Sequence, residues 1–161
     1  QGAMTSDAQV GRTAALDAEF AAGTMKMVVQ QTATWDEATA KQIVESVINS
    51  GETFNVIYAE NDGMAKGAVA ALDEAGITHG VGKAVIVMGF DCNKWALREL
   101  LAGNWNYDGQ CSPFQATVIA DMITKLEAGE TLTEKKVISE ERGFDATTIT
   151  QADIDTYGLG E

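Results

Sequence analysis

The sequence predicts an α/β fold: a doubly wound, mostly parallel sheet with helices on both faces. Short apolar runs alternate with amphipathic segments along most of the chain, a pattern typical of parallel strands joined by right-handed crossover helices. The run 84–90, AVIVMGF, is apolar without interruption, which indicates a central strand buried on both faces. The chain has 161 residues, of which 45% are hydrophobic, so it is long enough to build one domain around its own core.

Three helices and two strands are predicted in the first half of the chain. The helices cover about 7–22, from about 36 to the glycine at 51, and from the Asn61-Asp62 pair to Gly76. Apolar residues recur at helical spacing in the second and third of these helices. Asparagine and aspartate suit a helix start, and glycine readily adopts the left-handed conformation that ends a helix. The strands are predicted over 25–31 and 54–59.

The second half continues the alternation after the central strand. A helix carries Leu97, Leu100 and Leu101, a strand covers 106–111, and a further strand covers 133–139. Ser112-Pro113 is a typical helix start, with serine at the cap and proline in the first turn. The tail 150–157 is predicted to form a helical turn.

Composition excludes several classes of function. The formal net charge is −13, and an acidic chain repels phosphate backbones, so nucleic acid is not an expected partner. His79 is the only histidine, and the two cysteines lack the spacing of a metal site, so neither a metal nor a cofactor is expected. No apolar stretch approaches the length of a membrane span, and no signal peptide is recognisable, so any secretion signal is expected to lie outside these residues.

The candidate binding site lies where the predicted strands end, because open parallel sheets bind ligands at the carboxyl ends of their strands. The side chains there, with one from the first helix, are Arg12, Trp35, Asn61, Asp91, Gln110 and Cys111. Carboxylate, amide and guanidinium groups suit vicinal hydroxyls, and a tryptophan face suits the C–H side of a sugar ring. The set favours a polyhydroxylated ligand, and nothing in it suggests nucleophilic catalysis, so we expect no enzyme.

Each of these residues also has a simpler structural explanation. Asn61 could serve merely as a helix cap, and Trp35 could belong to the core. Asp91 could be a turn residue or a phosphoacceptor, and Arg12 a solvated helix residue. Gln110 could be a solvated strand end and Cys111 a small buried residue.

Four blocks of sequence resemble, in order, the ribose- and galactofuranose-type members of the periplasmic binding protein type I family, the substrate-binding proteins of sugar ABC transporters. They are NVIYAENDGMAKGAVAALDEAG, VIVMGFD, GQCSPFQATVIADMITKLEAGE and LTEKKVISEERGF. The resemblance implies ligand contacts for Arg12, Trp35, Asn61 and Asp91. For the last contact, the gap before the proline points to Cys111, whereas residue type points to Gln110.

The resemblance covers only the C-terminal half of a two-lobed family. It implies that 1–161 is the C-terminal lobe, that 112–130 belongs with the other lobe, and that the N-terminal lobe and the opening strand are absent, with Gln1-Gly2 placed where relatives end that strand. It further implies a monosaccharide ligand (a pentose or hexose), a membrane permease as partner, and a periplasmic or extracellular location, lipid-anchored in a Gram-positive cell. Without the other lobe, the apolar stripe of the helix after Pro113 is expected to cause self-association.

Two other functions share this fold. One is the effector-binding domain of a LacI-type transcriptional repressor, although no helix-turn-helix is present. The other is an enzyme or phosphoacceptor on a flavodoxin-like fold, which would need an acidic cluster at the first strand. Cys92 and Cys111 end strands expected to be neighbours, so they either form a disulfide in an oxidising compartment or remain two free thiols.

Overall fold

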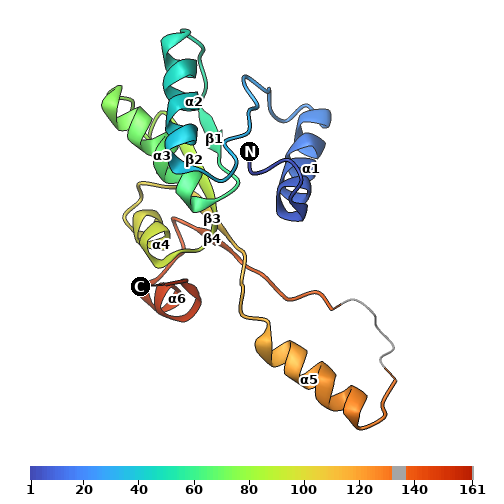
Figure 1. Cartoon of the computed structure of the whole chain (residues 1–161). Coiled ribbons are helices and arrows are strands. Elements are labelled where there is room, and N and C mark those ends of the chain that lie inside the picture. Colours follow the sequence, from blue (N-terminus) through green and yellow to red (C-terminus); the bar gives the residue numbers. More distant parts are fainter. Residues whose placement is uncertain (132–136, 161) are drawn as a thin grey trace.

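The computed structural model describes residues 1–131 and 137–160. Helices and strands alternate over much of this part of the chain (Figure 1). The helices are α1 (Asp7–Ala21), α2 (Glu37–Asn49), α3 (Asp62–Glu74), α4 (Lys94–Leu101), α5 (Ala116–Glu127) and α6 (Gln151–Tyr157). The strands are β1 (Val56–Tyr58), β2 (Ile86–Asp91), β3 (Tyr107–Gln110) and β4 (Gly143–Asp145).

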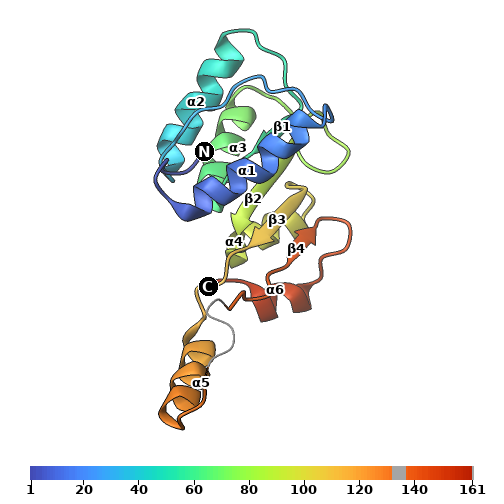
Figure 2. The ribbon, with the colours of Figure 1, turned by 90° about the vertical axis from the view of Figure 1, so that its right-hand side faces the viewer.

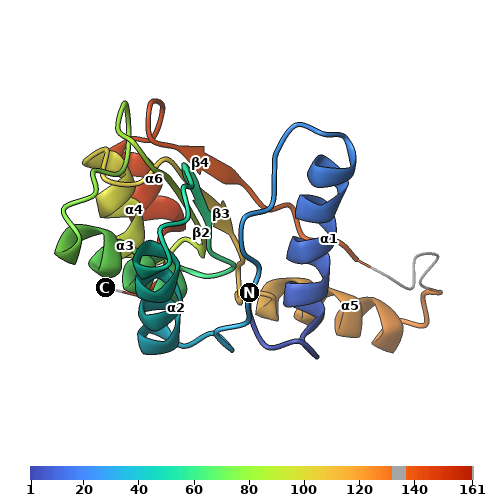
Figure 3. The same ribbon diagram turned by 90° about the horizontal axis from the view of Figure 1, so that it is seen from above.

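The four strands form one sheet in the order β1-β2-β3-β4. The β1–β2 and β2–β3 pairs are parallel, and β4 joins β3 antiparallel. Helices α2 and α3 lie on one face of the sheet, and α1 lies on the opposite face (Figures 2 and 3). The predicted α/β class is confirmed: the sheet is mostly parallel with helices on both faces, and most of the run 84–90 forms its inner strand β2. The prediction that this strand is buried on both faces is wrong, because Val87 is 0% exposed whereas Ile86 is 41% exposed.

The core lies between the sheet and the helices on the α3 side. Its most completely buried large side chains include Leu72 of α3, Val87 of β2, Leu97 of α4 and Trp105. Helices α2 and α3 approach each other so closely at Gly67 that a Cβ atom there would collide with the carbonyl oxygen of Glu37. The packed core of α2, α3, α4 and β2 thus holds the ends of the strands in place.

The prediction of a strand over 25–31 is wrong for this structure. No strand of the described chain pairs with these residues, and the backbone bends at Met25 and Val28. Met25, Val28 and Val29 are each exposed by more than a third. A strand exists only where a neighbour supplies hydrogen bonds, and no described segment supplies them to residues 25–30.

The start of α5 and the last strand also differ from prediction. Helix α5 begins at Ala116, not at Pro113, because the Ser112 hydroxyl accepts a hydrogen bond from the Phe114 N–H (3.3 Å) in a separate turn. In the predicted strand 133–139, residues 133–136 lie outside the described residues, and 137–139 form no strand. The strand that pairs with β3 is β4, where Phe144 is buried.

Helix α5 stands apart from the rest of the molecule in both Figure 1 and Figure 2. None of its residues is buried. Its apolar side chains Val118, Ile119, Ile123 and Leu126 are exposed by 36%, 52%, 51% and 54%. In the described residues, this helix does not pack on the sheet.

Candidate functional site

The guanidinium group of Arg12 lies at the centre of the candidate site. Its Nη1 donates to the carbonyl oxygen of Glu60, and its Nη2 lies 3.5 Å from Oδ1 of Asp91. Its central carbon lies 4.7 Å from the centre of the Phe90 ring and 5.8 Å from that of Trp35. The simpler explanation of Arg12 as a solvated helix residue does not hold, because its side chain is only 12% exposed.

Asp91 ends β2 in an unusual backbone conformation. Its φ angle is 118° and that of the following Cys92 is 60°. Positive φ angles favour glycine, and other residues that adopt them are found most often at functional sites. Burial raises the pKa of the Asp91 carboxyl, and the positive charge of Arg12 opposes this shift. The side chain remains 30% exposed, so its carboxylate is held beside Arg12 with room to accept further hydrogen bonds.

Trp35 lies before α2, where both it and Thr34 have positive φ angles of 70° and 53°. Its ring packs so closely on Gly2 that a Cβ atom there would overlap it. The side chain is half-buried and contacts the core cluster, so the core explanation is partly correct. The other part of the ring lies within cation–π distance of Arg12, on the side of the candidate site.

Asn61 caps α3, as its simpler explanation proposes. Its Oδ1 accepts from the N–H of Met64 at 2.8 Å. Its amide nitrogen donates to no residue in the described part of the chain. The cap therefore fixes the side chain with its donor group still available.

Gln110 and Cys111 follow one another at the end of β3. Gln110 is paired with Asp91 in the parallel register, and its N–H donates to Arg142 (2.7 Å). Burial raises the pKa of the Cys111 thiol, while the nearby charge of Arg12 lowers it. Arg12 therefore lies near the Cys111 thiol. Like the other four candidates, both are only partly buried.

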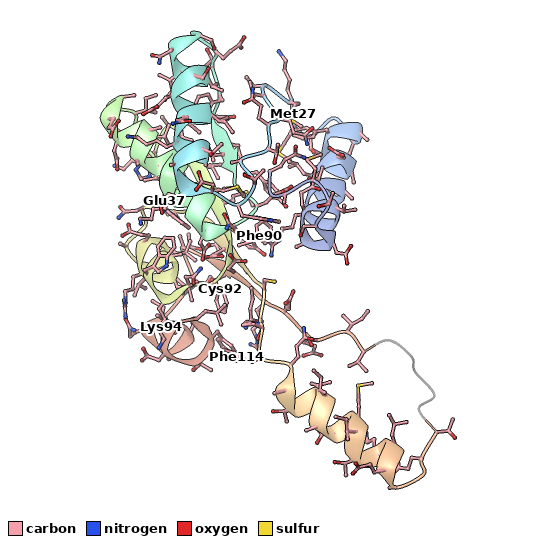
Figure 4. All side chains as sticks on the ribbon, viewed as in Figure 1. Met27, Glu37, Phe90, Cys92, Lys94 and Phe114 are labelled. Atoms are coloured by element: carbon pink, nitrogen blue, oxygen red, sulfur yellow. The ribbon has the colours of Figure 1, made fainter. Side chains whose placement is uncertain are left out.

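The disulfide predicted as one alternative for Cys92 and Cys111 is wrong for this structure, since both thiols are free. Cys92 is fully buried and lies 3.7 Å from Oδ1 of Asp108. Figure 4 shows Phe90 and Cys92 close together where β2 ends. In a regular strand, residues 90 and 92 would share a face, but the positive φ angles of Asp91 and Cys92 break the strand conformation. Phe90 therefore lies under Arg12 while the Cys92 thiol lies in the core.

Glu60 is an organising residue that the sequence analysis did not select. It is 1% exposed, and its carboxylate accepts from the N–H of Gly2 (2.6 Å) and the hydroxyl of Thr13 (2.5 Å). Its main-chain oxygen holds Arg12. The signal in the sequence was a carboxylate directly after an apolar run, where a charge is buried only if it has partners.

The buried carboxyl groups of Asp62 and Asp108 form an acidic pair. Oδ1 of Asp62 and Oδ2 of Asp108 are buried without a hydrogen-bond donor in the described residues. Oδ2 of Asp62 accepts from the N–H and the side-chain amide of Asn93 at 2.8 and 2.9 Å. Burial, together with repulsion between the two carboxyls, raises the pKa of Asp108 to about 9, and burial also raises that of Asp62. One proton shared by the pair would satisfy both unpaired oxygens.

The described residues contain no group of three histidine, cysteine, aspartate or glutamate side chains placed to hold a metal ion. Within the same residues, no helix is both long and apolar enough to cross a membrane. What the strand ends bring together is a cation, a carboxylate, an amide and two aromatic rings, all partly open to solvent. Such a set can bind hydroxyl groups and cover an apolar ring face.

Comparison with known proteins agrees with this geometry. The model of the periplasmic binding protein domain matches residues 1–131. The chain belongs to the periplasmic binding protein family. Among curated members of this family, it is 30% identical over 133 residues to the fructose import binding protein of Bifidobacterium longum and 40% identical over 79 residues to the D-apiose import binding protein of Actinobacillus succinogenes.

Solved structures show the same periplasmic binding protein fold. The arabinose transporter component from Shewanella sp. ANA-3, bound to L-arabinofuranose, has a TM-score of 0.86 at 24% identity over 98% of this chain. A Mycobacterium smegmatis structure in complex with β-D-fucofuranose has a TM-score of 0.79 at 25% identity over 97% of this chain. The chain spans 39% of the fructose protein, 24% of the apiose protein, and 52% and 49% of these two solved chains.

Proposed function

We propose that this chain forms one side of a monosaccharide-binding cleft in the solute receptor of an ABC importer. The observation that carries the proposal is that Arg12 of α1 lies beside both Trp35 and Asp91, at the carboxyl end of β2. A fork of N–H donors beside a carboxylate acceptor suits two neighbouring hydroxyls, and an indole face suits the C–H side of the ring. The amide of Asn61 supplies a further donor, and Gln110 and Cys111 border the site.

The relatives favour a receptor over the other candidate functions. They are named as binding proteins for fructose, apiose and galactofuranose, which supports transport rather than the LacI-type repressor or an enzyme. A receptor of this kind acts with a membrane permease. It works in the periplasm, or outside the cell, anchored by lipid in a Gram-positive organism.

The other side of the cleft would come from a second lobe. Residues 112–130 project from this lobe with an apolar helix face exposed (Figure 1), which fits a segment that packs on the missing half. Ligand closure in two-lobed proteins needs both lobes. This chain alone is therefore expected to bind sugar only weakly, because a one-sided site leaves half of the ligand in water.

The test is a thermal-shift screen of pentoses and hexoses on the intact two-lobed receptor, followed by calorimetry with the best ligand. The Asp91→Ala variant should lose on the order of 2–4 kcal/mol of affinity, because it leaves buried ligand hydroxyls and Arg12 without their acceptor. Asp145→Ala is a matched control. Asp145 also ends a strand, but because β4 is antiparallel it lies beside Tyr107, at the end of β3 that is far from the site.

The Trp35→Ala variant should weaken every bound sugar by a similar factor, because stacking depends on ring shape rather than on the hydroxyl pattern. Equal affinities for the wild type and Asp91→Ala would contradict the site assignment. If no pentose or hexose raised the unfolding temperature of the intact receptor, the proposed ligand class itself would be wrong.

A further inference from the structure

The backbone between β2 and α4 decides where the Asp91 carboxylate lies. The three residues Asp91 to Asn93 form this link, and Cys92 lies in it at the end of β2 (Figure 4). Asp91 and Cys92 have φ angles of 118° and 60°, which cost free energy in any residue other than glycine. Such a conformation persists only where the surrounding contacts hold it. The contacts of the 91–93 link therefore determine whether the Asp91 carboxylate stays beside Arg12.

Two fully buried carboxyl groups hold the 91–93 link by its backbone N–H groups. Oδ1 of Asp108, in β3, accepts from the Cys92 N–H at 3.3 Å. Oδ2 of Asp62, at the start of α3, accepts from the Asn93 N–H at 2.8 Å and from the Asn93 side-chain amide at 2.9 Å. The Cys92 carbonyl oxygen in turn accepts from the Leu159 N–H at 2.8 Å. The link is thus bonded to a helix, to a strand and to the C-terminal stretch.

The two carboxyl groups meet in a space that Gly89 leaves open. A Cβ atom at Gly89 would lie 2.7 Å from Oδ1 of Asp62 and 2.9 Å from the ring of Trp105. Gly89 is paired with Asp108 in the β2–β3 register. Its φ angle lies outside the left-handed region, so space rather than backbone conformation explains a glycine at this position. The inner strand therefore omits a side chain where the carboxyl pair lies.

The pair needs one proton to hold both N–H groups. Oδ1 of Asp62 and Oδ2 of Asp108 are buried and accept no hydrogen bond from the described residues, and the two side chains lie within hydrogen-bonding reach of each other. A proton between these oxygens leaves the other oxygen of each carboxyl to accept from the link. The titratable groups that face the pair are Asp91, whose negative charge adds to the repulsion, and the Cys92 thiol, whose pKa is raised by burial. Arg12 lies beyond them, beside Asp91.

We propose that the Asp62–Asp108 pair, joined by one proton, positions Asp91 for sugar binding by holding the N–H groups of Cys92 and Asn93. The proposal rests on the proposed function for what Asp91 binds, whereas the hold on the 91–93 link is a property of the protein without ligand. Both carboxyl groups are fully buried, so they act through the backbone of the link and not by touching the sugar.

Loss of the proton should release Asp91. Burial and mutual repulsion raise the pKa of Asp108 to about 9, so the pair holds its proton at neutral pH and loses it in alkali. Two charged carboxylates beside Gly89 then repel each other, and at least one turns away from its N–H partner. The link relaxes toward negative φ angles, and the Asp91 carboxylate moves away from Arg12.

The first test uses the intact receptor without sugar. Carbon-detected NMR follows the backbone nitrogen shifts of Cys92 and Asn93 and the carboxyl carbon shift of Asp91 between pH 6 and pH 10. All three should change in one common step near pH 9. In Asp108→Asn this step should disappear, because the new amide donates to Asp62 while its oxygen still accepts from the Cys92 N–H.

The Asp145→Asn variant is the control for this titration, because it removes an exposed carboxyl that makes its hydrogen bonds to Thr147. It should keep the common step. If the carboxyl carbons of Asp62 and Asp108 titrate while the nitrogens of the 91–93 link do not change, the pair does not position Asp91 and the proposal is wrong.

The second test is calorimetry of the intact receptor with fructose and L-arabinose, sugars named for two similar proteins. At pH 7 Asp108→Ala should lower the affinity by about tenfold or more, because it removes the acceptor of the Cys92 N–H. In an Asp91→Asn background the same change should cost less than about twofold, since the positioned carboxylate is already absent. Asp108→Asn should bind like the wild type. Equal losses in the two backgrounds would show a general structural role and would overturn the proposal.

The Leu72→Ala variant controls for loss of stability, because it opens the buried core about three turns further along α3 and leaves the 91–93 link intact. Its affinity should equal that of the wild type. If Asp108→Ala does not fold, the pH profile replaces it: wild-type affinity should fall by about tenfold or more between pH 7 and pH 10, and that of Asp108→Asn should not. Equal profiles would overturn the proposal. A receptor that shows the common NMR step but binds no pentose or hexose would contradict the proposed function and still support the positioning.

Discussion

The buried Asp62–Asp108 pair makes the stability of this protein depend on pH. Both side chains are 0% exposed, and one oxygen of each has no donor. In the unfolded chain both carboxyls titrate near the ordinary value of 3.8. In the folded chain the pKa values are raised, so the pair retains a proton. We predict that the Asp108→Asn variant loses most of this pH dependence, because an amide at this position donates to Asp62 without needing a proton.

The sign and size of the effect follow from linkage. A raised folded pKa stabilises the fold fully below pH 3.8, and this contribution is lost as the pH rises through the folded pKa of about 9. One retained proton corresponds to about 1.4 kcal/mol for each pH unit. The wild type should therefore lose up to about 2.7 kcal/mol of unfolding free energy between pH 5 and pH 7 relative to Asp108→Asn.

The measurement is urea unfolding at several pH values between 5 and 8, at one fixed protein concentration. Fluorescence of Trp105 reports the transition, because this residue is 1% exposed and packs edge-on against Trp95 at 5.9 Å. The quantity of interest is the difference in slope between wild type and variant, since other titrating groups are common to both.

The Asp145→Asn variant is the matched control. Hydrogen bonds from Thr147 lower the pKa of this exposed carboxyl, so its contribution is complete above pH 3.8 and is lost only as the pH falls further. Between pH 5 and pH 8 the free energy of unfolding of this variant should change with pH by the same amount as that of the wild type. An Asp108→Asn slope equal to that of the wild type would refute the shared proton.

Three further predictions follow from packing and exposure. Gly67→Ala should destabilise the protein by about 1–3 kcal/mol by forcing α2 away from α3, whereas Gly11→Ala, with open space around it, should not; urea unfolding measures both. Ile123→Glu should reduce self-association of this chain through α5, measured by sedimentation, and a monomeric wild type would contradict this. A thiol reagent should modify half-buried Cys111 before Cys92, which should react only on unfolding; equal rates would contradict the burial of Cys92.

Much of the candidate site was predictable because parallel strands end at one edge. The places of Arg12, Trp35 and Asp91 in the sequence predict that they share a site, and the structure brings Trp35 and Asp91 to the guanidinium group of Arg12. Asn61 both caps α3 and keeps a free amide, so its two interpretations are compatible. Glu60 was missed, because its importance lies in contacts to Gly2 and Thr13 far away along the chain.

By itself the sequence determined the fold class and the limits of α2 and α3, which caps and glycines set. These depend on residues close together in the chain, since capping, left-handed glycine and apolar periodicity are local. The tertiary structure alone decided that 25–31 is unpaired, that β4 is the strand beside β3, and that Asp62 and Asp108 face each other. Strand pairing and the desolvation of charge depend on segments that are distant in the sequence, so a local sequence pattern cannot predict them.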